Sequence, residues 1–259
     1  MSVLCGYASI DERGKVSGGK AGDQTGREVK TAPWYQFGQN VVLRFKDREK
    51  AKEAAECMRW LCDTNYVGYD QIQRTTAYNA LKKLKWKYKK LKLKTETDCS
   101  QLISTVLNCV GIKVSPNIYT GNMVKALMDT GQFKKYTNSN LLKSDKFLAK
   151  GDIIINEKTH VIMALSNGKY YKNKIPYHYN GEAPILPRKG YYEKGNTGKN
   201  VARLQTFLAW CNLYKDDIDG SYGQNTVDAV KGFQMAVGIE IDGSFGKKSL
   251  EKLKEHCKK

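Results

Sequence analysis

The hydrophobic and polar positions of the first half of the chain predict one strand and three helices. Residues 41–45 form a short apolar run typical of a strand, and residues 48–61 carry apolar positions at helical spacing. Residues 75–90 predict a second helix that is very basic, and residues 99–110 predict a third. The third helix is apolar on most of its sides, which indicates a helix buried in the centre of a domain.

The pattern changes to strands after residue 150. Residues 152–155 and 160–165 read as strands, and Asn167-Gly168 is a strong hairpin-turn dipeptide that would lead into a partner strand at 169–173. Helices followed by strands favour an α+β domain, which we place at residues 1–174.

The C-terminal part contains an internal repeat. Residues 218–227 match residues 241–250, and each copy has an Asp-Gly turn, an aromatic residue, and a Thr or Ser that would cap a following helix. Together with a helical stripe over 201–208, this predicts a small all-α module at 191–259. The stretch 175–190 has three of the five prolines of the chain, counting Pro176, and shows no periodicity, so it is expected to be a linker.

The net charge of +18 favours polyanionic partners, such as nucleic acid, anionic lipid or the teichoic acids of a Gram-positive wall. A solvated, lysine-rich surface explains the charge equally well. Nucleic acid is the least favoured partner because no zinc-finger, helix-turn-helix or aromatic RNA-binding pattern accompanies the charge. No apolar run is long enough to insert into a membrane.

The seven cysteines show no CxxC pair, so we expect no metal site and no cofactor. The N-terminal residues do not resemble a signal peptide. Free thiols in a reducing cytoplasm are therefore expected.

Cys99 differs from the other cysteines because it begins the apolar helix, directly after the candidate cap Asp98. The positive end of the helix dipole and unpaired backbone N–H groups there would stabilise the thiolate. An ordinary buried cysteine at a helix start would give the same pattern.

His160 is the natural base for such a thiol, since His178 falls in the expected linker and His256 in the Lys-rich C-terminal end. A plain histidine at a strand edge is the alternative. In a two-residue hairpin Ile162 would pair with Asn173, which places Asn173 on the face of His160 as a group that could orient the imidazole. A bulge would bring Lys172 to that position instead.

These residues resemble the NlpC-type branch of the papain-like cysteine peptidases. The resemblance rests on Asp98-Cys99-Ser100-Gln101-Leu102, Gly151-Asp152-Ile153-Ile154 and Thr159-His160-Val161-Ile162-Met163. The opening stretch, with residues 8–12, 18–26 and Trp34-Tyr35, looks like the front of such domains in phage lysins, and the C-terminal repeat looks like a three-helix peptidoglycan-binding module. The third position of the family often holds His, and Ser-Gly-Leu or Ser-Ser-Leu is commoner after the cysteine than Ser100-Gln101-Leu102.

The resemblance implies a phage endolysin in which Cys99 and His160 hydrolyse an amide bond of the wall peptide or its attachment to muramic acid. It implies substrate contacts around Asp98 and Ser100. Asp23, Gln24 and Trp34 are further candidates for the substrate groove, with a solvated loop and core packing as their alternatives. The enzyme would wait in the host cytoplasm until a separate pore releases it to the peptidoglycan. A non-catalytic wall-binding protein and a wall acyltransferase using the same dyad are the competing functions.

Overall fold

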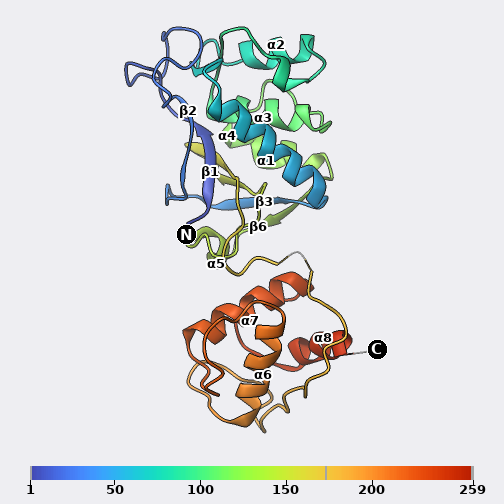
Figure 1. The fold of residues 1–259 in the computed structure, drawn as a ribbon. Coiled ribbons are helices and arrows are strands. Elements are labelled where there is room, and N and C mark those ends of the chain that lie inside the picture. Colours follow the sequence, from blue (N-terminus) through green and yellow to red (C-terminus); the bar gives the residue numbers. More distant parts are fainter. Residues whose placement is uncertain (1, 173, 258–259) are drawn as a thin grey trace. The chain divides into compact units, whose positions relative to one another are not determined.

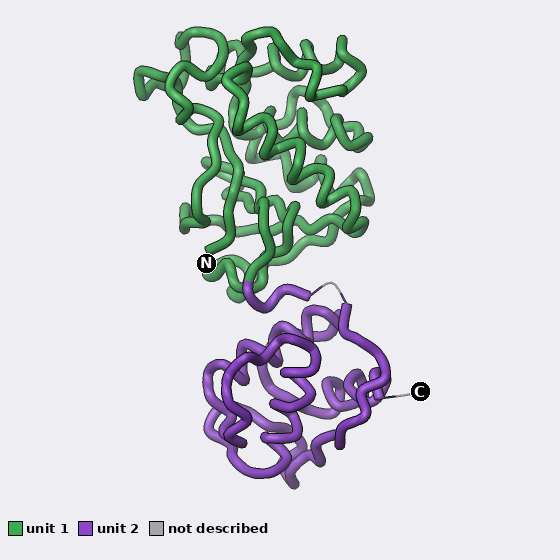
Figure 2. Tube along the Cα trace, in the orientation of Figure 1, with its two compact units in different colours: residues 1–168 green, residues 169–259 purple. Residues whose placement is uncertain are grey.

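The computed structural model describes residues 2–172 and 174–257, and the chain divides into two compact units, residues 1–168 and 169–259 (Figures 1 and 2). The first unit mixes strands and helices, and the second is helical. No helix within the described ranges is both long and apolar enough to span a membrane.

The first unit contains a six-stranded antiparallel sheet with the strand order β2-β1-β8-β7-β3-β6. Its strands are β1 (Leu4–Ala8), β2 (Val29–Pro33), β3 (Val41–Phe45), β6 (Phe133–Tyr136), β7 (Ile153–Asn156) and β8 (His160–Ala164). The predicted strands at 41–45, 152–155 and 160–165 are confirmed. The central position of β7 and β8 explains their continuous apolar sequences, because both of their faces are covered.

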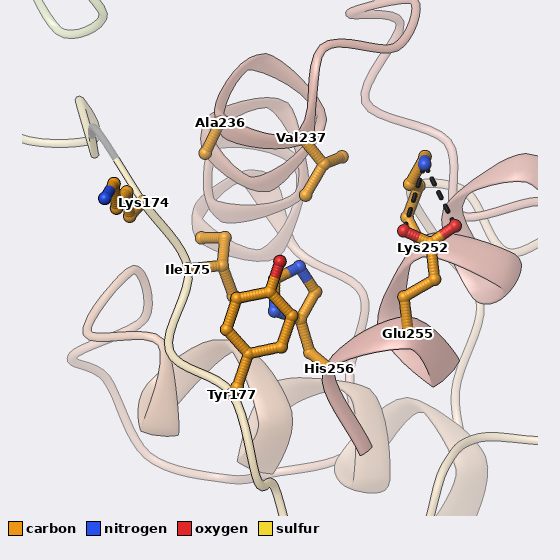
Figure 3. Close-up of a pocket in the computed structure, with 8 residues that line it drawn as sticks. All are labelled: Lys174, Ile175, Tyr177, Ala236, Val237, Lys252, Glu255 and His256. Atoms are coloured by element: carbon orange, nitrogen blue, oxygen red, sulfur yellow. Dashed lines mark hydrogen bonds and ion pairs between the residues drawn. The ribbon is translucent and has the colours of Figure 1, made fainter. Parts of the chain in front are cut away.

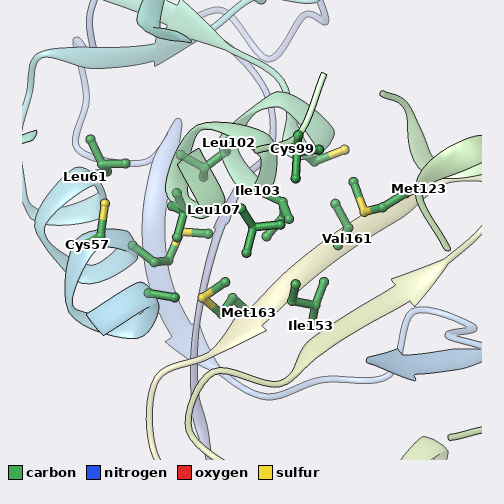
Figure 4. Packing of buried hydrophobic residues seen from close by; sticks show 14 of the residues in the cluster. Cys57, Leu61, Cys99, Leu102, Ile103, Leu107, Met123, Ile153, Val161 and Met163 are labelled. Carbon is green, nitrogen blue, oxygen red and sulfur yellow. The ribbon is translucent and has the colours of Figure 1, made fainter. Parts of the chain in front are cut away.

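Helices α1 and α3 pack against this sheet (Figure 1). The helices of the unit are α1 (Arg48–Asp63), α2 (Thr76–Lys83), the short 3-10 helix η1 (Tyr88–Lys90), α3 (Cys99–Cys109), α4 (Thr120–Asp129) and α5 (Ser139–Leu142). A separate pair of parallel strands, β4 (Val67–Tyr69) and β5 (Thr95–Thr97), leads into α3. Between α1, α3 and the sheet lies the main core, in which Leu61, Leu102, Leu107, Ile153 and Met163 are buried (Figure 4).

A buried ion pair ties the strands of the sheet together. Arg44 on β3 donates to both carboxylate oxygens of Asp152, at 2.9 and 2.6 Å, and Asp152 also accepts from the Ala149 N–H. Asp152 is completely buried and Arg44 is 6% exposed. The Gly-Asp motif before β7 therefore has a structural role, because it holds the start of β7 against β3.

The structure corrects three expectations about the first unit. The order is not helices first, because β1, β2 and β3 precede α1. The basic helix ends at Lys83 rather than at residue 90, since Lys85 and Trp86 adopt left-handed φ angles of 51° and 63° that an α-helix cannot continue.

The prediction of a hairpin after Asn167 is also wrong, because residues 169–172 form no strand. Both edges of β8 are already occupied, one by β7 and the other by β1, so a returning strand would find no free edge. Asn167 instead accepts a hydrogen bond from the Lys150 N–H, and the Gly168 N–H donates to the Leu148 carbonyl.

The second unit is built on helices α6 (Lys199–Trp210), α7 (Gln224–Val237) and α8 (Lys247–Cys257) around a core of aromatic side chains. The two copies of the internal repeat form equivalent turns, and one glutamine side chain holds each turn. The Gln205 amide donates to Asp219 and to the Ser221 carbonyl and accepts from the Gly220 N–H; Gln234 does the same for Asp242, Ser244 and Gly243. Gly220 and Gly243 have φ of 71° and 80°, as the predicted Asp-Gly turns require.

Two details of this unit differ from expectation. Thr226 does not cap α7: Gly223 holds the cap position, and the Thr226 hydroxyl donates back to the Ser221 carbonyl. Residues 175–190 are not a free linker, because Ile175 and Tyr179 are buried in the core of the helical unit and the Tyr179 ring contacts Phe207 at 5.2 Å. Burial of these apolar side chains outweighs the flexibility that the prolines suggested.

Candidate active site

Cys99 is the first residue of α3, and its position is fixed from both sides of the helix start. Asp98 caps the helix by accepting from the Gln101 N–H at 2.7 Å. Its other carboxylate oxygen accepts from Arg74 at 2.6 Å, and Arg74 also donates to the Ile118 carbonyl. Strand β5, paired with β4, ends directly before Asp98. The position of Cys99 is therefore fixed by this strand, by the Asp98 cap and by the Asp98–Arg74 ion pair.

The Cys99 thiol lies against the beginning of β8. The backbone N–H of Val161 and the hydroxyl of Ser100 both approach the sulfur, the latter at 3.9 Å, and Figure 4 shows Cys99 beside Val161 and Met123. The side chain is in the core and the residue is only 9% exposed. Val161 follows His160 directly in β8, so the start of β8, where His160 lies, is next to the start of α3.

Burial dominates the ionisation of Cys99. It raises the pKa of the thiol to about 11; the negative charge of Asp98 adds to the rise, while Ser100 and the Val161 N–H oppose it. The helix terminus alone would predict a thiolate. In this structure the thiol is protonated at neutral pH, and a base must remove its proton during reaction.

His160 provides a neutral imidazole at this place. Burial lowers the pKa of His160 to about 4, so the ring is uncharged at neutral pH and can accept a proton. Its ring makes edge-to-face contacts with Tyr7, at 5.7 Å between centroids, and with Phe37, at 5.4 Å. Among the described residues the imidazole makes these two ring contacts and forms no side-chain hydrogen bond.

An aromatic wall of Tyr7, Tyr35 and Phe37 surrounds the imidazole, and sequence reasoning missed it. Tyr35 contacts both Tyr7 and Phe37, with centroids 5.7 and 5.5 Å apart. Burial raises the pKa of the Tyr35 hydroxyl, and Tyr7, Cys5 and Cys99 add to the rise. Tyr35 and Phe37 are two residues apart in an extended segment, so their side chains face the same side.

The group that would orient His160 is not found at the expected position. Asn173 lies outside the described residues, and Ile162 pairs with Ile154 instead of a returning strand. The pairing argument that selected Asn173, or Lys172 after a bulge, therefore no longer applies.

Two of the remaining candidates, Asp23 and Gln24, have side chains that hydrogen-bond within their own loop. Asp23 is 3% exposed, and its carboxylate accepts from five backbone N–H groups between residues 25 and 29, which leaves no free lone pair directed to a substrate. The Gln24 side chain donates to carbonyls of its own loop, including Gly22 at 2.6 Å. Trp34 is half-buried: its backbone N–H donates to the Val3 carbonyl, and its indole Nε1 is buried without a hydrogen-bond partner among the described residues. Its neighbour Tyr35 contacts Tyr7 and Phe37, the two rings against His160.

The groups at the start of α3 and of β8 are of the kinds used in nucleophilic chemistry on a carbonyl. They are a thiol with backbone N–H groups beside it on α3, and a neutral imidazole on β8. Among the described residues no group of three His, Cys, Asp or Glu side chains is arranged to hold a metal ion.

A buried carboxylate lies in the strand that leads to this site. Glu96 on β5 is 2% exposed, and neither of its carboxylate oxygens has a hydrogen bond of normal geometry among the described residues. Burial raises the pKa of Glu96 to about 8; the nearby carboxylates of Glu28 and Asp70 add to the rise, and the Gly22 N–H opposes it.

From the raised pKa of Glu96 we expect the folded protein to lose stability as the pH rises. In the unfolded chain Glu96 ionises near its usual value of 4.5, whereas the folded chain keeps the proton until pH 8. The free energy of unfolding therefore falls as pH rises through this window. Glu96→Gln should raise the melting temperature at pH 8.5 by about 5 °C and leave it unchanged at pH 4.

Calorimetry of the two proteins at both pH values tests this, with Glu53→Gln on the exposed face of α1 as the control. An equal melting temperature for Glu96→Gln and its parent at pH 8.5 would show that Glu96 is ionised at no cost.

The second unit has a hollow of about 370 Å³ between residues 174–177, the end of α7 and α8 (Figure 3). The exposed Tyr177 ring stacks on the buried His256 ring, with centroids 4.5 Å apart, and His256 Nδ1 lies 2.8 Å from the Pro176 carbonyl. These contacts fasten the segment to α8. Lys252 and Glu255 pair on the opposite wall, and no cysteine lines the hollow, so it is separate from the candidate active site.

Comparison with known proteins gives matches for both units. Residues 5–171 match the family model described as an endolysin-like domain, and residues 197–253 match a model of peptidoglycan binding domains. A spore cortex-lytic enzyme of Oceanobacillus iheyensis is 38% identical over 61 residues, which are 24% of this chain and 22% of that protein. A probable N-acetylmuramoyl-L-alanine amidase of Bacillus licheniformis is 46% identical over 56 residues, 21% of this chain and 16% of that protein.

Among solved structures, the crystal structure of the SleB N-terminal domain shares 31% identity with 26% of this chain and 93% of its own chain, at a TM-score of 0.26. The chain thus spans about a fifth of the length of the curated relatives it matches. The first match covers most of the chain, and it agrees with the extent of the first unit. The chain belongs to the endolysin-like domain family and carries a peptidoglycan-binding domain behind it.

Proposed function

We propose that this protein is a peptidoglycan hydrolase that cleaves an amide bond of the wall by a Cys/His mechanism, in a catalytic domain of the NlpC, papain-like type. The observation that supports the proposal is that the Cys99 thiol, at the start of α3, lies against the backbone N–H of Val161, the residue that follows His160 in β8. The relatives named as cortex-lytic enzymes and amidases, and the peptidoglycan-binding domain, support the wall as substrate.

The mechanism follows from the protonation states. Cys99 Sγ attacks the amide carbonyl carbon while its proton passes to the neutral His160 imidazole. Backbone N–H groups at the start of α3 hold the oxyanion that forms. The imidazolium then gives the proton to the leaving amine as the C–N bond breaks, which leaves a thioester on Cys99.

Water completes the cycle. His160 takes a proton from a water molecule that attacks the thioester carbonyl. As the C–S bond breaks, the imidazolium returns that proton to the sulfur, which releases a carboxylic acid and restores the free thiol and the neutral imidazole. Tyr7 and Phe37 contact the imidazole and exclude water from it, so the ring is neutral before the reaction begins. It becomes basic enough to take the proton only when negative charge develops on the sulfur close by.

We further propose that the protein serves host lysis as a phage lysin, held in the cytoplasm until a separate pore gives it access to the wall. A family described as endolysin-like supports this role.

Digestion of purified Gram-positive walls tests the reaction. Full-length protein should release free amines in equal number to new carboxylates, and mass spectrometry of the fragments should assign the cut to one amide bond. Release of reducing sugar ends without free amines would contradict the proposal. Reaction with iodoacetamide, followed by peptide mapping, should show that loss of activity follows the alkylation of Cys99 rather than of the other six cysteines.

A further inference from the structure

One segment of the first unit concentrates positive charge far beyond the rest of the chain. Residues 82–94, from the end of α2 through η1 to the approach of β5, contain eight lysines in 13 positions and no acidic residue. All eight lysines are exposed. We call this region the 82–94 lysine surface.

The outward direction of the lysines is fixed by the residues between them. Leu91 is buried, and Leu84, Trp86 and Tyr88 pack against the core. The Trp86 ring contacts Tyr78 at 4.9 Å, and the Tyr88 ring contacts Trp60 at 5.6 Å. The lysines are therefore displayed by an anchored segment rather than by a loose tail.

This charge is not balanced within the described residues. None of the eight lysines forms an ion pair there. Lys89 lies over the Tyr88 ring, and Lys92 and Lys94 lie over Tyr66, so these cations contact rings instead of carboxylates. Glu53 and Glu56 on α1 are the carboxylates that act on Tyr88 within this segment, and Glu56 already pairs with Lys150 at 3.5 Å.

The side chains of the 82–94 lysine surface favour one class of polyanion as its partner. Its aromatic rings are half-buried in the core, so no exposed ring is available for the base stacking that single-stranded nucleic acid needs. Leu93, at 65% exposure, is the only exposed apolar side chain in the segment, which is too little for insertion into a lipid surface. Lysines act as mobile point charges without the fixed bidentate geometry of arginine, which suits a flexible chain of repeated phosphates.

We propose that the 82–94 lysine surface binds a phosphodiester polymer of the Gram-positive wall, of the teichoic acid type, and so adds a second attachment to the one made by the peptidoglycan-binding domain. The inference rests on the proposed function for the choice of the wall as the source of this polyanion.

Sedimentation with purified walls tests the inference. The variant K82Q/K83Q/K87Q/K90Q removes four exposed lysines whose side chains form no hydrogen bond, ion pair or ring contact among the described residues. The variant K46Q/K113Q/K134Q/K135Q removes four exposed lysines elsewhere in the same unit. Both are made in full-length Cys99→Ala protein, so that binding is measured without hydrolysis. The walls are used untreated or after hydrofluoric acid has cleaved their phosphodiesters.

The surface variant should bind untreated walls at least about tenfold more weakly at 0.1 M salt, with a shallower dependence of affinity on salt, because fewer counterions are released. The control variant should lose clearly less, and all proteins should bind stripped walls alike. Equal losses for the two variants, or equally tight binding of the unsubstituted surface to treated and untreated walls, would overturn the proposal.

Two further probes separate the sources of phosphate. If the surface variant loses binding only to phosphatidylglycerol vesicles or to double-stranded DNA, and not to untreated walls, the partner is not a wall polymer. Hydrolysis of stripped walls by protein with Cys99 intact reports on the proposed function separately, since that substrate keeps its amide bonds.

Discussion

Cys99→Ala is expected to reduce the release of amines from purified walls by at least about 10⁴-fold while the protein remains folded. The sulfur supplies the only nucleophile in the proposed mechanism, and without it no acyl-enzyme can form. Because Cys99 has little exposed area and lies at a helix start capped by Asp98, the smaller alanine leaves the cap and the ion pair with Arg74 in place. Wall binding through the second unit should be unchanged.

The matched control for this experiment is Cys109→Ala, which changes the last residue of the same helix. This variant should keep nearly full activity, because Cys109 lies at the far end of α3 from the junction with β8. His160→Gln should lose activity to a similar degree as Cys99→Ala, since a protonated thiol with a pKa of about 11 needs a base. Lysis of walls by Cys99→Ala at the rate of its parent would exclude the cysteine mechanism.

Asp152→Ala is expected to have the largest effect on stability. The substitution leaves the Arg44 guanidinium buried without its carboxylate partner, and breaking a buried pair in this way costs about 3–5 kcal/mol. The first unit should then melt about 10 °C lower. Differential scanning calorimetry measures this, because the two units can give separate transitions.

The double variant R44M/D152L tests whether the cost comes from the isolated charge. It should recover much of the lost stability, since both charged groups are then replaced by apolar side chains of similar size. Lys125→Ala breaks an exposed i,i+4 pair with Asp129 on α4 and should change the melting temperature by less than about 2 °C. A shift as small as this for Asp152→Ala would mean that the buried pair does not hold β7 to β3.

Elements with a strong local signal were predictable from the sequence. The strand at 41–45, the helix from residue 48 and the helix beginning at Cys99 appear at or within two residues of the expected bounds. β1, β2 and α4 were not recognised, although β1 and β2 complete the sheet beside β8. The five residues of β1 and of β2 are too few to distinguish a strand from a loop by pattern.

The candidate site was predictable only in part. Cys99 and His160 could be chosen because a cysteine at a helix start and a rare histidine in a strand stand out within the chain. Tyr7 and Phe37 could not be chosen, because their importance comes from strand order: β1 lies next to β8, and the segment after β2 brings Phe37 to the imidazole.

By itself the sequence determined the local features of this protein: the helix that presents Cys99, the strand that begins with His160, the repeated Asp-Gly turns and the excess of lysine. Each of these depends on neighbouring residues, whose spacing is visible along the chain. Only the tertiary structure decided that β8 has no free edge for a hairpin, that residues 175–190 pack into the helical unit, and that burial keeps both the thiol and the imidazole neutral. These properties depend on contacts between distant segments and on the water they exclude, which no local pattern records.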